Sequence, residues 1–441
     1  MQILIALLLS FLLIFLQASF AQDNRQLQGL REYLKANRPP GYDSTLNYVN
    51  YIKGTDLHYL YPLYQLIREE DRFKKILSIP GYYDELSQAL ACNGDYTSSL
   101  EYLQKGYDSV VDEVARRQIN KVIQGFKNVQ HADARRYISF LARNYQVVMI
   151  NEAHNKPQHR AFVLALLDDM YKKGFRYLAM EMLNNYSNRS PDKLTPLTGH
   201  YCSEPVAGEL VRTAIDMGFR LVPYEDTAAD IHTATQRDSI QALNIYKIIL
   251  ADSTARILVL GGYAHIAEKN ISNDYIPMGM AFKKISGIDP LTIDQVNMTE
   301  GSDFTYGKVF YDAYTQKFSL TSPSIALIDE QPVDVTSSNL YDLCVIHPPT
   351  IYKDSRPGWL NLNGRRQPLY IKPSNKNTFL AQAYYQFESF SARPGQVIPA
   401  DQTYIPTSKG NYLLYLRRGK YIVVFRDMQY KTLNTLHVEV D

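Results

Sequence analysis

The sequence is poor in cysteine and has no excess of charge of either sign. Its three cysteines, Cys92, Cys202 and Cys344, lie far apart and form no C-x-x-C pair, so the sequence encodes neither a disulfide framework nor a zinc knuckle. Two of them could still pair in an oxidising compartment. Lysine and arginine number 47 against 45 aspartates and glutamates, a net charge of +2 without a long basic block. Nucleic acid is therefore not expected as a partner.

Several catalytic motifs are also missing. The chain contains no G-x-S-x-G elbow, no phosphate-binding P-loop and no G-x-G-x-x-G turn. Their absence removes support for a serine nucleophile of the α/β-hydrolase kind and for the binding of nucleotide phosphates. Beyond the first residues, no apolar run is long enough to cross a bilayer.

The one long apolar run lies at the start of the chain. Residues 3–16 contain a single polar side chain and are followed by Ser19-Phe20-Ala21, a small-x-small cleavage pattern. We therefore expect residues 1–21 to be a secretory signal and the mature chain to be soluble and periplasmic or extracellular. No lysine or arginine precedes the apolar run, so an uncleaved membrane anchor is the alternative.

The 441 residues are long for one domain and predict three regions after the leader. Residues 22–140 carry amphipathic stretches broken by glycines, which indicates a helical region. Residues 141–350 alternate strands and helices and predict an α/β core with a mainly parallel sheet and flanking helices. Residues 366–441 contain short strands around a hairpin signal, which predicts a small β-sandwich-like domain.

Two short motifs follow apolar stretches of the predicted core. Residues 146–150 lead into N-E-A-H at 151–154, and residues 256–260 lead into G-G-Y-A-H at 261–265. Short continuous apolar runs indicate strands that are buried on both faces of a parallel sheet. Because ligands gather beyond the carboxyl ends of such strands, we expect both histidines at an active site.

Two more predicted strands end in carboxylates. Residues 176–180 precede Glu181, and residues 219–223 precede Tyr224-Glu225-Asp226. An unpaired carboxylate behind a buried strand costs several kcal/mol. Glu152 and Glu181 are therefore expected to have a partner such as a protonated histidine, an arginine or a metal, whereas Glu225 could merely cap the following loop.

Two arginines lie near the starts of predicted helices. His159 and Arg160 fall in the first turns of the helix expected over 157–172, where the helix dipole favours an anion. Arg160 could bind a substrate carboxylate or an oxyanion, or could pair with a carboxylate of the protein. Arg237 and Asp238 open a later helix, where Asp238 suits the dipole and Arg237 could reach the cleft or pair with a carboxylate.

A fold that gathers these strand ends would hold two imidazoles and up to three carboxylates in one cleft. In one mechanism, Mn²⁺, Co²⁺ or Zn²⁺ bound by His154, Glu181 and His265 lowers the pKa of a water from roughly 15.7 towards about 7. In the other, one histidine oriented by a glutamate is the general base, and the other histidine or an arginine stabilises the oxyanion. Core or surface positions are expected for the remaining histidines, namely His58, His131, His200, His232, His347 and His437.

These motifs together resemble one superfamily. The residues are 151–154 with Pro157, His159 and Arg160, then Met180-Glu181, Arg237-Asp238 and the G-Y-A-H run at 262–265. Over about residues 140–300 they resemble the superfamily that unites erythromycin esterases, ChaN-like haem-binding lipoproteins and Tiki/TraB proteins. In that superfamily a G-E-x-H motif ends the first strand, a Glu ends the second, and a G-x-x-H motif ends a later one. The resemblance implies that His154, Glu181 and His265 are functional, with Glu152 and Arg160 in support.

One position departs from the pattern of the superfamily. Asn151 stands where the first motif usually has a glycine. Asparagine tolerates left-handed backbone conformations, so a tight loop could still form there.

Activities within that superfamily are divided. The esterases hydrolyse a macrolactone with His and Glu, Tiki-like members resemble metal-dependent peptidases, and ChaN-like members bind haem. The leading hypothesis is an exported hydrolase that activates water against an ester or amide bond of a small molecule or peptide. One alternative is a protein that binds haem in the same cleft without catalysis. Another is a scaffold whose helical and β regions contact other envelope proteins.

Overall fold

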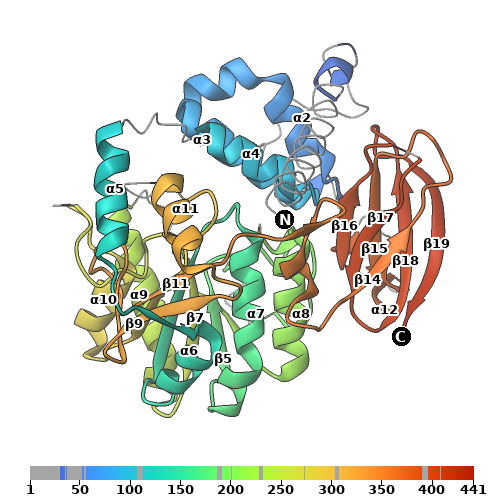
Figure 1. Cartoon of the computed structure of the whole chain (residues 1–441). Helices are drawn as coiled ribbons and strands as arrows, with labels where there is room; N and C mark the ends of the chain where they lie inside the picture. Colours follow the sequence, from blue (N-terminus) through green and yellow to red (C-terminus); the bar gives the residue numbers. More distant parts are fainter. Residues whose placement is uncertain are drawn as a thin grey trace. The chain divides into compact units, whose positions relative to one another are not determined.

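The structure, a computed structural model, describes residues 30–34, 36, 52–53, 56–106, 113–185, 191–199, 201–227, 232–272, 274–302, 307–389, 396–407 and 409–441 (Figure 1). The predicted signal at residues 1–21 and His200 lie outside the described residues. Contacts divide the chain into two units, one of residues 109–350 and one of residues 1–108 together with 351–441. None of the described helices has the length and apolar character needed to span a membrane.

The unit of residues 109–350 is built on a nine-stranded sheet. Its strands in chain order are β3 (Gln130–Asp133), β4 (Val147–Glu152), β5 (Tyr177–Met180), β6 (Arg220–Pro223), β7 (Ile257–Gly262), β8 (Leu291–Asp294), β9 (Ser324–Ile328), β10 (Gln331–Pro332) and β11 (Leu343–Ile346). Their spatial order is β10-β9-β11-β8-β4-β7-β5-β6, with β3 also paired to β9. The strands from β11 to β6 are parallel, whereas β3, β9 and β10 pair antiparallel.

Helices precede and connect the strands of this sheet, as the alternating pattern predicts. They are α5 (Glu113–Gly125), α6 (Ala134–Ala142), α7 (Pro157–Lys172), the 3₁₀ turn η1 (Tyr201–Ser203), α8 (Pro205–Met217), α9 (Ala234–Ala251), α10 (Met278–Ser286) and α11 (Gly307–Phe318). The α/β class with a mainly parallel sheet and flanking helices is therefore confirmed. α7 has the predicted bounds, whereas α9 begins three residues before Arg237 because Thr233 and Gln236 form a capping box.

The two strands that carry the histidine motifs lie in the interior of the sheet. Every residue of β4 and of β7 is buried, and β4 lies between β7 and β8. Alternate residues of β4 and β7 pack against α9 and α10 on one face of the sheet. The other residues point to the opposite face, where α7 contacts β4 and packs beside α8 (Figure 1). The sheet is thus covered on both faces, as its continuous apolar runs predict.

The unit of residues 1–108 and 351–441 combines helices with antiparallel sheets. Its elements are β1 (Ile52–Lys53), β2 (Asp56–Leu57), α2 (Leu60–Arg68), α3 (Glu70–Cys92), α4 (Tyr96–Gly106), β12 (Tyr352–Lys353), β13 (Arg356–Pro357), η2 (Gly358–Asn361), β14 (Gln367–Ile371), β15 (Leu380–Tyr385), α12 (Gln386–Ser389), β16 (Asp401–Tyr404), β17 (Tyr412–Leu416), β18 (Gly419–Arg426) and β19 (Thr432–Val440). A four-stranded sheet, β16-β15-β18-β19, and the β14-β17 pair share one apolar core. Separate antiparallel sheets at the C-terminus therefore agree with the predicted β region.

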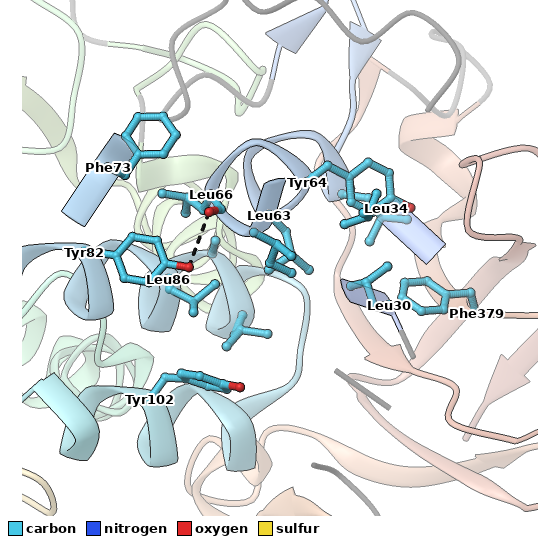
Figure 2. Packing of buried hydrophobic residues seen from close by; sticks show 14 of the residues in the cluster. Leu30, Leu34, Leu63, Tyr64, Leu66, Phe73, Tyr82, Leu86, Tyr102 and Phe379 are labelled. Atoms are coloured by element: carbon cyan, nitrogen blue, oxygen red, sulfur yellow. Dashed lines mark hydrogen bonds between the residues drawn. The ribbon is translucent and has the colours of Figure 1, made fainter. Parts of the chain in front are cut away.

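The helices of this unit pack on a second apolar cluster (Figure 2). Tyr82 of α3 is fully buried, and its hydroxyl donates to the carbonyl of Leu66 at 3.3 Å. Phe379, just before β15, belongs to the same cluster as Leu30 and Leu34. The N-terminal helices and the C-terminal strands therefore share a core, although some 270 residues separate them in the sequence.

The two units divide the chain differently from the regions expected from the sequence. Residues 113–140 were expected within one helical region, but α5 packs on α11, and β3 pairs with β9 of the large sheet. These long-range contacts place the boundary near residue 108 rather than residue 140. The three cysteines are all buried and free, so the pairing that the sequence left open is not formed.

Truncation of Ile245 tests the packing of α9 on the sheet. Ile245 is completely buried against β7, whereas Leu250 on the same helix is 65% exposed. Ile245→Ala is expected to lower the free energy of unfolding by about 2–5 kcal/mol, and Leu250→Ala by less than about 0.5 kcal/mol. Urea denaturation followed by far-UV circular dichroism measures both; equal effects would contradict the packing described here.

Candidate active site

The two histidine motifs emerge side by side from neighbouring strands. β4 and β7 are parallel and in register, with Asn151 opposite Gly261 and Glu152 opposite Gly262. Asn151 is part of strand β4, so the left-handed conformation considered for it is not used. Its Nδ2 instead donates to Asp294 Oδ1 at 2.7 Å and to the carbonyl of Tyr263 at 2.8 Å. The positive φ of this region falls at Tyr263, at 43°.

His154 is held between a carboxylate and two tyrosine rings. Its Nδ1 lies 3.4 Å from Glu152 Oε1. The ring stacks on Tyr201 with centroids 4.4 Å apart and planes 11° apart, and it meets the ring of Tyr263 edge-on at 5.0 Å. The side chain is 19% exposed, so it remains accessible.

The absence of a side chain at Gly262 lets His154 and Glu181 approach the same point. A Cβ on Gly262 would lie 2.8 Å from His154 Nε2 and 2.9 Å from Glu181 Oε2. Contacts that short do not occur for a real Cβ atom, so any side chain at this position would displace His154 or Glu181. The Nε2 edge of the imidazole and the Glu181 carboxylate therefore border one position beside the end of β7.

Glu152 and Arg160 form a buried ion pair behind His154. Arg160 Nε donates to Glu152 Oε2 at 2.9 Å, and Nη2 donates to Oε1 at 3.0 Å and to the carbonyl of His154 at 3.1 Å. Nη1 lies 3.5 Å from Glu204, the N-cap of α8. Burial alone would raise the pKa of Glu152, but the charge of Arg160 and the bond to His154 hold it below its ordinary value.

Arg160 is therefore a positioning residue. It is 1% exposed, and its donors face protein acceptors. The sequence left two roles open for Arg160. In this geometry it pairs with a carboxylate of the protein and does not face a position for a substrate anion.

Glu181, at the end of β5, is shared by both halves of the site. Its Oε2 accepts from the backbone N–H of Gly262 at 2.5 Å, and Oε1 accepts from Arg237 Nη2 at 2.6 Å. Oε1 is also 3.7 Å from His265 Nε2. Burial alone would raise the pKa of Glu181, but His265, His154 and Arg237 together lower it below its ordinary value. Glu181 is therefore ionised at neutral pH.

His265 forms a second histidine–carboxylate pair, with Asp238 of α9. Its Nδ1 lies 2.8 and 2.9 Å from the two oxygens of Asp238, which is completely buried. Tyr275 Oη and the backbone N–H of Met278 also donate to Asp238 Oδ2, at 2.8 and 2.9 Å. Burial alone would lower the pKa of His265, but Asp238 and Glu181 outweigh it and raise the pKa above its ordinary value. His265 is thus held in one orientation and gains affinity for a second proton.

Arg237 is the arginine of the site with an accessible side chain, at 34% exposure. It pairs with both Glu181 and Glu225, and its Nη1 lies 3.1 Å from His265 Nε2. Gln241 Nε2 donates to the same glutamate, Glu225, at 3.0 Å. Burial lowers the pKa of Arg237, but the two carboxylates raise it more, so the guanidinium stays charged. Glu225 therefore holds Arg237 rather than merely capping a loop.

The structure brings the predicted trio His154, Glu181 and His265 together, with Glu152 and Arg160 behind His154. His159 lies elsewhere: it is completely buried, and its Nδ1 accepts from the backbone N–H of Ala153 at 3.0 Å. Burial holds the pKa of His159 far below its ordinary value, which suits a neutral structural residue.

Four residues of the site were not identified from the sequence. Asp238 is explained equally well by the helix dipole, so its bond to His265 leaves no separate signal. Tyr201 precedes α8 in a segment without apolar periodicity, and Glu204 is an ordinary helix N-cap from its sequence context. The tyrosine of the G-Y-A-H motif, Tyr263, is the one that its motif could have pointed to.

The donor atoms of the trio do not fit a metal ion in this arrangement. Among the described residues no group of three or more His, Cys, Asp or Glu side chains could hold one. The guanidinium of Arg237 lies 3.1 Å from His265 Nε2 and 2.6 Å from Glu181, where a bound cation would also need to lie. The same guanidinium faces His265 Nε2, so in this arrangement that nitrogen is not available to a haem iron.

Comparisons with known proteins identify no family for this chain. No family model and no curated protein matches it. Half of the chain is similar to a solved structure described as "The structure of the type III effector HopBA1", with 13% identity, 97% of that chain covered and a TM-score of 0.31. Half is also similar to one described as "Bacterial protein toxins", with 14% identity, 47% of that chain covered and a TM-score of 0.28. At these TM-scores the likenesses carry no argument about fold or function.

Removal of Arg160 tests the buried ion pair. Arg160→Met leaves the Glu152 carboxylate buried without its cation, so it is expected to lower the free energy of unfolding by about 3–5 kcal/mol. Glu152→Leu combined with Arg160→Met removes both charges and should recover most of that loss. Urea denaturation of the single and double variants measures the difference; a double variant as unstable as Arg160→Met would contradict the pairing.

Proposed function

We propose that this chain is an exported hydrolase that activates water with His154 and cleaves an ester or amide bond. One observation carries the proposal: two histidines, each oriented by its own carboxylate, face a third carboxylate that they share. His154 is paired with Glu152, and His265 is paired with Asp238. Both histidines lower the pKa of Glu181. A general base and a general acid need this kind of fixed orientation and mutual proximity.

His154 is the general base of this proposal. Its Nδ1 faces Glu152, which favours a proton on Nδ1 and a lone pair on Nε2. Nε2 is the atom beside Gly262 and Glu181. A water bound there would lose its proton to Nε2 as it attacks the carbonyl carbon. The imidazolium that forms is stabilised by Glu152 and Glu181.

His265 and Arg237 form the electrophilic side. Arg237 is accessible and permanently charged, so it can stabilise the oxyanion that develops on the attacked carbonyl. Asp238 and Glu181 raise the pKa of His265. When Arg237 turns from Nε2 to the oxyanion, Nε2 can hold a proton and pass it to the leaving oxygen or nitrogen. Glu181 lies beside both histidines, and its charge contributes to the raised pKa of His265.

Export belongs to the same proposal. It is supported by the apolar run at residues 3–16 and by the small-x-small pattern that ends at Ala21. A hydrolase of the cell envelope or the medium would meet esters and amides of external compounds or of peptides.

Substitution of the two histidines tests the proposed chemistry. A screen of ester and peptide substrates with the full chain is expected to give hydrolysis that falls about 10²–10⁴-fold in His154→Gln and in His265→Gln. His437→Gln, at an exposed position of β19, is the matched control and should keep full activity. Far-UV circular dichroism checks that the variants fold.

The same screen with a chelator and with added Mn²⁺, Co²⁺ or Zn²⁺ tests the role assigned to Arg237. Activity is expected to be unchanged by both treatments, because the guanidinium already neutralises Glu181. Turnover retained in either histidine variant would refute the assignment. A Soret band on titration with haemin would instead support the haem-binding alternative.

Substitution of Asp238 tests the protonation of His265. If His265 must be protonated, activity is present below its pKa and is lost as the pH rises through it. Asp238→Asn removes the negative charge that raises this pKa, so the alkaline limb of kcat/KM should move to lower pH. Asp216→Asn, on an exposed position of α8, should leave the limb in place. A limb that does not move in Asp238→Asn would assign it to another group.

A further inference from the structure

The unit of residues 1–108 and 351–441 contains a pocket of about 220 Å³ that the proposed hydrolysis does not use. It lies where the turn between α3 and α4 meets the β12–β13 hairpin and the ends of β16 and β17. Side chains that line it include Asp95, Asp354, Arg356, Thr403, Tyr404 and Tyr412. Pockets for drug-sized ligands measure roughly 300–1,000 Å³, so this one suits a smaller molecule.

Arg356 is a buried donor in the wall of this pocket. It is 1% exposed; its Nη2 donates to Asp401 at 2.5 Å and its Nη1 to the carbonyl of Gly94 at 2.9 Å. No described residue accepts a hydrogen bond from its Nε. A buried N–H without a partner is costly, and an acceptor atom of a ligand in the pocket would satisfy it.

Two carboxylates, those of Asp95 and Asp354, also line the pocket. Asp95 accepts from the backbone N–H of Ser98 at 3.2 Å and from Thr97 Oγ1 at 3.3 Å, both at Oδ1. Asp354 lies in the two-residue turn of the β12–β13 hairpin, with a φ of 50°, and is exposed. Because the charge of Arg356 is balanced by Asp401, these carboxylates leave the pocket with an excess of negative charge. The pocket therefore disfavours an anion.

The ligand must accept a hydrogen bond at Arg356 and donate hydrogen bonds at the carboxylates. Hydroxyl groups do both. Tyr404 and Tyr412 add aromatic rings, and the hydroxyl of Tyr412 is fixed by hydrogen bonds to the backbone of Thr407. Such rings can pack on the C–H face of a sugar. We propose that this pocket binds a single ring of a neutral or amino sugar.

Trp359 provides a specific probe of this site, because it is the single tryptophan of the chain. Its ring lies 5.1 Å from that of Tyr96, and the same Tyr96 ring lies 5.1 Å from the guanidinium carbon of Arg356. The full chain is titrated with glucose, N-acetylglucosamine, glucosamine and glucuronic acid while tryptophan fluorescence is recorded. At least one neutral or amino sugar should give a saturable change, and glucuronic acid should bind at least tenfold more weakly.

Asp354→Gly removes one carboxylate and keeps a residue that tolerates the positive φ of the turn. It also removes the exposed hydrogen bond from Tyr370 Oη to Asp354 Oδ2. It is expected to weaken the binding of the sugar at least tenfold with at most a small change in melting temperature. Asp329→Gly is the matched control, since Asp329 lies in the equivalent two-residue turn between β9 and β10, with a φ of 48°. It should bind as the unaltered chain does. No saturable change with any sugar, equal binding of glucuronic acid, or unaltered affinity in Asp354→Gly would each overturn the proposal.

Discussion

Buried carboxylates around the ends of the parallel strands are the constraint on which the candidate site depends. The side chains of Glu152, Glu181 and Asp238 are 3%, 12% and 0% exposed. A carboxylate so far from water is tolerated only beside a cation or several donors. Arg160 meets this need for Glu152, Arg237 for Glu181 and His265 for Asp238. Each anion thereby fixes one basic group. Asp238 fixes His265 directly, and the Glu152 carboxylate that Arg160 holds in place faces Nδ1 of His154.

The backbone supplies the second requirement, which is close approach. Because Gly262 has no side chain, the imidazole of His154 and the carboxylate of Glu181 can border one position. Gly279 plays a similar part at the start of α10, where a Cβ would lie 2.3 Å from the carbonyl of Ile266. Because Gly279 has no side chain, α10 can pack against the segment that carries His265. The backbone N–H of Met278 then donates to Asp238. The two glycines are thus needed for packing, without any special backbone conformation.

Local patterns predicted the parts of the fold that depend on nearby residues. The apolar runs before His154 and His265 indicated buried strands, and Pro157 marked the start of α7, because burial and helix capping are visible over a few positions. The pairing of β3 with β9 and the bond between Asp238 and His265, 27 positions apart, depend on tertiary contacts that leave no periodic signal. The roles of the arginines could not be predicted for the same reason. Arg160 is buried and Arg237 is accessible, although both lie near the start of a helix.

The Glu152–Arg160 ion pair adds little to the stability of the fold, so its presence needs another explanation. The cost of removing both charges from water largely offsets their attraction, so a well-packed apolar pair of similar volume would be about as stable or more so. An apolar pair, however, could not orient His154. The carboxylate of Glu152 faces Nδ1, and Arg160 donates to the carbonyl of the same histidine, so the pair fixes both the ring and the backbone of residue 154. The presence of this ion pair is therefore better explained by the position of the imidazole than by the stability of the fold.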